Sequence, residues 1–204
     1  MTKYLKGEII TGLFNNKKEN TIQTILHVNE RLQPEHRVSY YEEHLQGIFK
    51  REKVGNVVGG SSVFFKDGGI ASCDVNIDCF ESKINRMLEL LHYIPMAKGS
   101  KFIVFNSEGR VDREYPLGEL EGIGIYLNGV DLPKEVYKQC DINYVVDQIF
   151  QLLETPPILY SYWQGHTETA LYFYAPSFNT MYTRIRPLLT TYPLCQKSKV
   201  AQIT

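Results

Sequence analysis

The chain has 204 residues, of which 43% are hydrophobic and 22% are charged, and this composition excludes a disordered protein. The 22 basic and 23 acidic side chains give a formal net charge of −1, so no excess of positive charge can neutralise nucleic acid or an anionic membrane. No apolar run approaches the ~20 residues that cross a bilayer, and no signal-peptide core is present, so we expect a cytoplasmic protein.

The first part of the chain predicts a strand-helix-strand-strand-helix-strand series. Residues 1–19 precede this series as an extension, in which the segment 4–14 is a candidate edge strand. Pro34 suits the first turn of a helix, and Lys66-Asp67-Gly68-Gly69 is typical of a hairpin turn. The predicted elements, in chain order, are a strand at 21–29, a helix at 34–53, strands at 54–65 and 71–80, a helix at 82–93 and a strand at 101–106.

Two motifs of the first part lack residues that would make them ligand sites. The glycines of Val58-Gly59-Gly60-Ser61-Ser62 could approach a phosphate, but the Lys and the following helix of a phosphate-binding loop are absent, which favours a bulge or a tight bend. The segment 74–78 has the D-x-N-x-D pattern of a calcium loop. Such a loop needs Gly and Glu at its sixth and twelfth places, where this chain has Cys79 and Asn85, so we expect no metal site.

The predicted strand at 71–80 alternates between polar and apolar residues. Successive side chains of a strand point to opposite faces, so one set faces the core and the other lies on an open, acidic face. Asp74 and Asp78 are therefore candidate binding residues. The outward set is Ser72, Asp74, Asn76 and Asp78, and the inward set is Cys73, Val75, Ile77 and Cys79.

Residues 107–120 are predicted to be a linker, after which the same series of elements recurs in residues 121–204. Asp141 is a candidate cap for the first helix of this second series. The predicted elements are a strand at 122–127, a helix at 143–154, strands at 158–163 and 169–174, a helix at 179–189 and a strand at 199–203.

An internal repeat supports the two parallel series. Near the start of each series, equivalent residues are about 100 positions apart, as for Ile25 and Ile125 and for Leu32 and Leu132. The sequence therefore predicts an α+β protein of two tandem ferredoxin-like β-α-β-β-α-β repeats, at 20–106 and 121–204, whose antiparallel sheets each have helices on one face. The residues that recur 98 positions later are Phe80, Arg86, Leu90, Leu91, Pro95, Ser100 and Lys101, which fall on Phe178, Arg184, Leu188, Leu189, Pro193, Ser198 and Lys199.

The second open face is predicted to be aromatic. Tyr172 and Tyr174 take the places of Asp74 and Asn76 in the repeat, and we expect Tyr160 and Tyr162 of the neighbouring strand on the same face. Such a patch indicates a contact surface, while a seam between the halves or a homodimer interface remains the alternative. RNA binding is disfavoured, because Glu154 and Glu168 are the only charged residues between Leu153 and Pro176.

The segment from Trp163 to Glu168 is the best single candidate for chemistry. His166 could act as an acid or a base that Glu168 orients, although a histidine in a polar hairpin is more often simply exposed. No Ser or Cys has a partner at a spacing that defines a nucleophile, so we assign no catalytic residue and no cofactor. The four cysteines form no C-x-x-C pair, and we expect free thiols and no zinc site.

Three segments carry a resemblance to known sequences: GIGIYLNGVDLPKEVYKQCDIN, SYWQGHTETALYFYAPSF and PLLTTYPLCQKSKV. With them the chain resembles an uncharacterised bacterial family of tandem ferredoxin-like proteins. The resemblance implies the fold, and it brings no activity and no catalytic residue.

The leading hypothesis is a non-enzymatic binding protein that docks a protein partner on an aromatic and acidic sheet surface, for example a bacterial inhibitor or immunity protein that neutralises a toxin. The alternative is a small-molecule sensor or an enzyme with a cleft between the two repeats. A homodimer joined by the tyrosines is the third hypothesis. The candidate contact residues are Tyr160, Tyr162, Trp163, His166, Glu168, Tyr172, Tyr174, Asp74 and Asp78.

Overall fold

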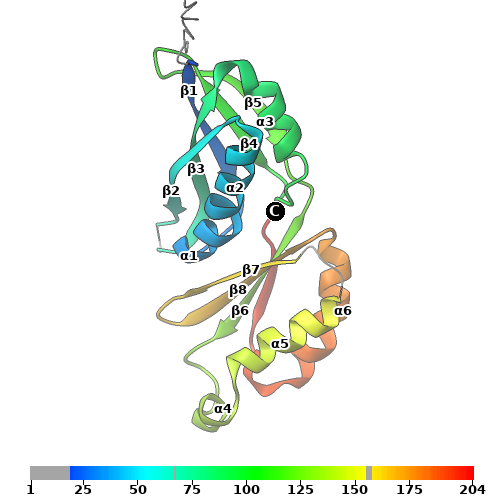
Figure 1. The fold of residues 1–204 in the computed structure, drawn as a ribbon. Helices are drawn as coiled ribbons and strands as arrows, with labels where there is room; N and C mark the ends of the chain where they lie inside the picture. Colours follow the sequence, from blue (N-terminus) through cyan, green and yellow to red (C-terminus); the bar gives the residue numbers. More distant parts are fainter. Residues whose placement is uncertain (1–18, 67, 155–157) are drawn as a thin grey trace, which may run out of the picture.

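The computed structural model describes residues 19–66, 68–154 and 158–204, and Figure 1 shows how they are arranged. The candidate edge strand at 4–14 and Asp67 of the expected hairpin turn lie outside the described residues. Two antiparallel sheets and several helices confirm the α+β class. Within the described ranges, no helix combines the length and the apolar character that a membrane crossing requires.

The first half of the chain contains a five-stranded sheet in the order β2-β3-β1-β4-β5, with all neighbouring strands antiparallel. The helix predicted at 34–53 begins at Pro34 and ends at Glu52, with a π-helical stretch in its middle. A register shift between Val57 and Gly59 agrees with the bulge predicted at the glycines. The elements are β1 (Thr21–Val28), α1 (Pro34–Arg37), the π-helical Val38–Glu42, α2 (Glu43–Glu52), β2 (Gly55–Phe64), β3 (Ile70–Phe80), the 3-10 turn Glu81–Lys83, α3 (Ile84–Leu91), β4 (Ser100–Phe105) and β5 (Val111–Leu117).

The second half contains a four-stranded antiparallel sheet in the order β7-β8-β6-β9. The side chain of Asp141 accepts a hydrogen bond from the Asn143 amide at 2.8 Å, which confirms the predicted helix cap. The short helix α4 was not predicted. The elements are β6 (Glu121–Asn128), α4 (Lys134–Gln139), α5 (Ile142–Leu153), β7 (Leu159–Gln164), β8 (Glu168–Ala175), α6 (Phe178–Thr191), the 3-10 turn Pro193–Cys195 and β9 (Lys199–Gln202).

Each half has its own hydrophobic core between its sheet and its helices. Phe49 of α2 and Met87 of α3 are fully buried in the first core, and Ile149 of α5 and Ile185 of α6 are fully buried in the second. The alternation predicted for β3 is confirmed from Cys73 to Cys79, because its four inward residues have no exposed surface, whereas Asp74 and Asp78 on the other side remain partly exposed. Ser72 of the predicted outward set is buried. Each sheet is therefore packed on one face by its own helices.

The segment 107–120, predicted as a linker, contains strand β5. This strand pairs with β4 and adds a fifth strand to the first sheet. After β5 the chain is tied to the end of the first half, since the Lys98 amide donates to Leu120 O at 2.8 Å and the Leu120 amide donates to Met96 O at 2.9 Å. Gly118 makes this turn possible, because it has a φ of 88° and any Cβ there would collide with the Ala97 carbonyl.

We expect Gly118→Ala to lower the free energy of unfolding by about 3 kcal/mol, since it combines a strained φ with a clash against backbone. Gly109→Ala is the matched control, because Gly109 has a φ of 73° but nothing within 4 Å of the added methyl group. Gly109→Ala should lower the free energy of unfolding by only about 1 kcal/mol, from φ strain alone. Urea unfolding of both variants measures the difference, and equal losses would contradict the clash.

Candidate functional site

The open face of the second sheet is covered by the first half of the same chain. Ala97 and Leu120 pack against Ala170, Tyr172 and Tyr174 in a third cluster of buried residues, separate from the two cores. In Figure 1 the first half lies on one side of the second sheet, and α5 and α6 lie on the other. The aromatic surface predicted to contact a partner is thus largely a seam within the chain, which was the alternative interpretation.

The prediction that four tyrosines share one face is wrong. Tyr172 lies opposite Ser161 and Tyr174 opposite Leu159, whereas Tyr160 lies opposite Phe173 of the second core. Directly opposite residues of an antiparallel pair have their side chains on the same face. Tyr160, and Tyr162 with it, therefore point to the helix side of the sheet, because a shift of one residue in the alignment of two strands exchanges the faces.

Arg31 connects the loop after β1 to the tyrosines of the seam. Its backbone amide donates to Tyr174 Oη at 2.7 Å, and its Nη1 donates to Tyr126 Oη at 2.7 Å. Its guanidinium carbon lies 5.4 Å from the ring centroid of Tyr172 and 5.0 Å from that of Phe65. These distances are typical of cation–π contacts, so one side chain joins both halves through hydrogen bonds and ring faces.

A second group of contacts covers the outer edge of β7. The Gln33 amide donates to Ser161 Oγ at 3.0 Å, and the Gln33 side chain donates to Tyr162 O at 2.8 Å. The hydroxyl of Tyr40 donates to Tyr160 O at 3.1 Å. Edge carbonyls of β7 are therefore satisfied by side chains of the first half.

Glu30 is fully buried beside the seam, and none of the described residues is a basic partner for it. Its Oε1 accepts from the Ala97 amide at 2.8 Å, and both carboxyl oxygens lie 2.8 Å from Tyr41 Oη, which also lies 3.2 Å from Pro95 O. Burial raises the pKa of Glu30 to about 7. A protonated Glu30 satisfies every group, since its own hydroxyl can donate to Tyr41 Oη and the Tyr41 hydroxyl can then donate to Pro95 O.

The hairpin between β7 and β8 contains His166 and Glu168, the candidate residues for chemistry. Its Gly165 amide donates to Glu168 O at 2.9 Å, and the Trp163 ring packs over Gly165 and against the seam cluster. His166 is exposed, and the structure, which describes both residues, shows no hydrogen bond between His166 and Glu168.

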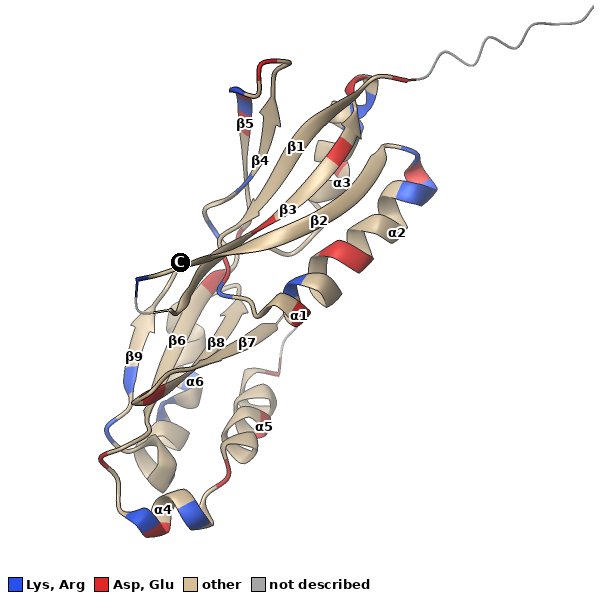
Figure 2. Cartoon of the chain, turned by 90° about the vertical axis from the view of Figure 1, so that its left-hand side faces the viewer, with Lys and Arg blue, Asp and Glu red and all other residues tan. Residues whose placement is uncertain are grey.

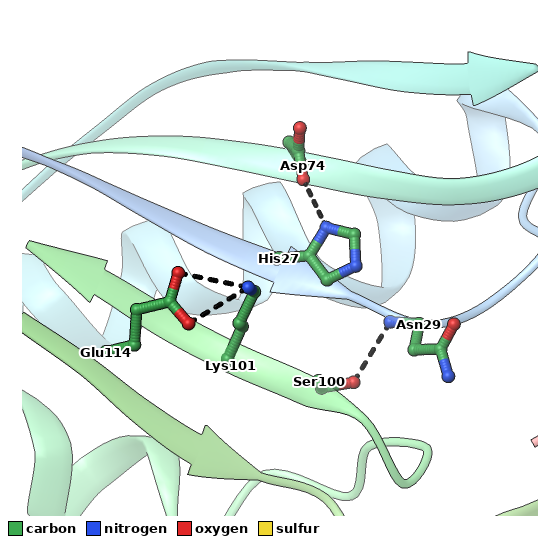
Figure 3. Close-up of polar contacts among 6 residues, drawn as sticks. All are labelled: His27, Asn29, Asp74, Ser100, Lys101 and Glu114. Carbon is green, nitrogen blue, oxygen red and sulfur yellow. Dashed lines mark hydrogen bonds and ion pairs between the residues drawn. The ribbon is translucent and has the colours of Figure 1, made fainter. Parts of the chain in front are cut away.

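The open face of the first sheet contains a histidine that the sequence interpretation missed. Figure 3 shows His27 of β1 beside Asp74 of β3, with Nδ1 and Oδ1 2.8 Å apart. Both side chains are 25% exposed, and the carboxylate orients the imidazole. Alternation along β1 places His27 on the face opposite the buried Leu26 and Val28, but only the pairing of β1 with β3 brings it to Asp74.

The groups around this pair are engaged elsewhere. Ser100 is buried and its Oγ accepts a hydrogen bond from the Asn29 amide at 3.0 Å (Figure 3). Lys101 Nζ lies 3.0 Å from a carboxylate oxygen of Glu114. The described residues thus place no free nucleophile beside His27.

Two adjoining depressions lie along the seam and share Ile94 and Pro95. One has a volume of about 400 Å³ and extends to Pro176, and the other has about 250 Å³ and extends to Tyr40 and Leu159. Neither is lined by the residues predicted for a cleft, which are Tyr160, Tyr162, Trp163, His166, Glu168, Tyr172 and Tyr174.

We expect the protein to lose stability as the pH rises through the range from 4.5 to 7. Unfolded Glu30 loses its proton near 4.5, whereas folded Glu30 keeps it up to about 7, so the unfolded state binds fewer protons in this range. The loss reaches up to about 3 kcal/mol and should be absent in Glu30→Gln, whose amide reproduces the protonated carboxyl. Urea unfolding at several pH values measures the free energy of unfolding of the wild type and of Glu30→Gln. If the two proteins depend on pH in the same way, Glu30 is ionised in the fold.

Comparison with known proteins gives no relative: no family model matches the chain, and no curated protein is similar to it.

Proposed function

We propose that this chain is a non-enzymatic binding protein that docks a protein partner on the open face of its first sheet. The observation that carries the proposal is the difference between the two sheets. The open face of the second sheet is buried by the first half, whereas Asp74, Asp78 and His27 on the first sheet retain exposure. In Figure 2, strands β1 and β3 lie in front of α3, and acidic positions are visible along β3.

The chemistry of this face indicates the kind of partner. Ile25 and Ile103, adjacent in the pairing of β1 with β4, are half-buried in the middle of the face, and the carboxylates of Asp74 and Asp78 lie on the next strand. An apolar centre beside charged groups is the usual arrangement of a protein interface. The acidic groups favour a basic partner, which they would steer and orient.

A protein with these features suits an inhibitor or an immunity protein that neutralises a toxin, acting in the cytoplasm. No catalytic machinery is needed for that role, since occupation of the toxin surface is sufficient. The four cysteines are free, and three of them are buried, which is consistent with a reducing compartment.

We further infer that the two halves are tandem ferredoxin-like units. The strands of each half, numbered within the half, follow the order second-third-first-fourth, and β5 is an addition to the first half. In each half a helix connects the first strand to the second and another connects the third to the fourth. This is the β-α-β-β-α-β arrangement in both copies, which supports a duplication.

The double variant Asp74→Asn, Asp78→Asn should weaken the partner's binding by about tenfold or more, because it removes two interface charges while it preserves side-chain size. A pull-down from the native cell identifies the partner, and titration calorimetry measures its dissociation constant. The control is Asp131→Asn, Asp147→Asn, which makes the same change in net charge at exposed positions of the second half. Equal dissociation constants for the two double variants would contradict the proposal that this face binds the partner.

Small-molecule binding at the seam is the second candidate function. It is favoured by the two adjoining depressions, whose shared wall at Pro95 lies next to the buried Tyr41 and Glu30. Pockets between structural units are common ligand sites.

A ligand of the 250 Å³ depression should raise the melting temperature of the wild type but not that of Ser39→Trp, because the indole would fill the depression that Ser39 lines. A thermal-shift screen provides the measurement. The control is Ser107→Trp at an exposed position after β4. A ligand that stabilises all three proteins equally binds elsewhere.

A further inference from the structure

Strand β2 is a long edge strand without the usual protection against pairing. It has ten residues, GNVVGGSSVF, with no charged residue and no proline. Within the described part of the chain, β3 is its only neighbouring strand. In Figure 2 it is tan throughout, whereas α2 carries charged positions. Natural edge strands are usually kept from pairing by charges, by proline, by shortness or by a covering segment.

Each of the other three described sheet edges has at least one of these protections. Strand β5 contains three consecutive charged residues, 112–114, followed by Pro116. Strand β9 has only four residues and begins with Lys199. Strand β7 is covered by Gln33 and Tyr40, which bind its outer carbonyls. The absence of protection is thus specific to β2 among the edges that the structure describes.

The accessible part of β2 begins at Val58. The preceding amide, of Val57, donates to Gln46 Oε1 at 2.7 Å, so a side chain of α2 occupies the start of the edge. Beyond it, Val58 is 58% exposed and Val63 is 43% exposed. Between the register shifts at the two ends, Gly59 to Val63 pair regularly with β3, and nothing lies within 4 Å of the side-chain position of Gly59. A glycine in a strand permits another backbone to approach closely.

We propose that two copies of the chain associate through antiparallel pairing of their β2 strands, about a two-fold axis near Gly60 and Ser61. A two-fold axis places one strand opposite the same strand of its partner, so any charge on it would face a like charge nearby. The lack of charge from Gly55 to Phe64 removes this repulsion, and the net charge of −1 adds little between whole chains. Self-pairing is therefore the association that this edge fits best.

The pairing joins two five-stranded sheets into one continuous sheet of ten. Val58, Val63 and their symmetry mates would come together, and both would lose solvent exposure. The inference is independent of the proposed function, because the open face of each sheet stays free in the dimer. It also differs from a homodimer joined by the tyrosines, which are already in contact within one chain.

Sedimentation velocity of the full chain tests the proposal. Wild type at up to about 100 μM, a concentration that populates complexes with micromolar dissociation constants, should sediment with twice the 23.5 kDa mass of one chain. The double variant Val58→Lys, Val63→Lys should raise the dimer dissociation constant by about tenfold or more, through like charges across the two-fold axis.

The control is Val111→Lys, which places one Val-to-Lys change on the opposite edge of the same sheet, at a residue that is 52% exposed. This control should dimerise as the wild type does. Wild type that remains monomeric throughout the range overturns the proposal, and this result does not depend on the folding of any variant. A dimer that the double variant retains in full, with circular dichroism showing it folded, also overturns it.

Discussion

The open face of the second sheet has to be covered, because Tyr172 and Tyr174 would otherwise place two large rings in water. The first half covers it with the loop after β1 and with the turn that follows β5. Arg31 donates hydrogen bonds to two phenol oxygens of the seam, those of Tyr174 and Tyr126. The relative position of the halves therefore depends on burial of the aromatic face, and the hydrogen bonds of Arg31 fix the geometry in which that burial occurs.

The same constraint explains why the two open faces differ. Asp74 and Asn76 stand in the first half where Tyr172 and Tyr174 stand in the second, so equivalent strand positions are polar on one face and aromatic on the other. If both faces were aromatic, the first sheet would need a cover that the described chain does not supply. The first half thus covers the open face of the second sheet, and the open face of the first sheet stays accessible.

Most of the strands and helices could be predicted, because the alternation of β3 and the cap at Asp141 are local signals. β5 was missed, since its sequence VDREYPL is largely polar and contains a proline, and only its pairing with β4 makes it a strand. The repeat spacing of about 100 also does not identify which residues of β1 face the core. It aligns Ile25, which lies opposite Asn76 on the open face, with Ile125 of the core, whereas Leu26 is the residue that faces the core in β1.

The site residues could be predicted only in part, because the important contacts join positions far apart in the chain. Tyr172 and Tyr174 were found as an unusual aromatic pair, but nothing near Glu30 or Arg31 indicates that they meet Ala97 and Tyr174. A buried glutamate to which the described residues give no basic partner is costly unless it is neutral, so the stability of the fold is expected to depend on its protonation between pH 4.5 and 7.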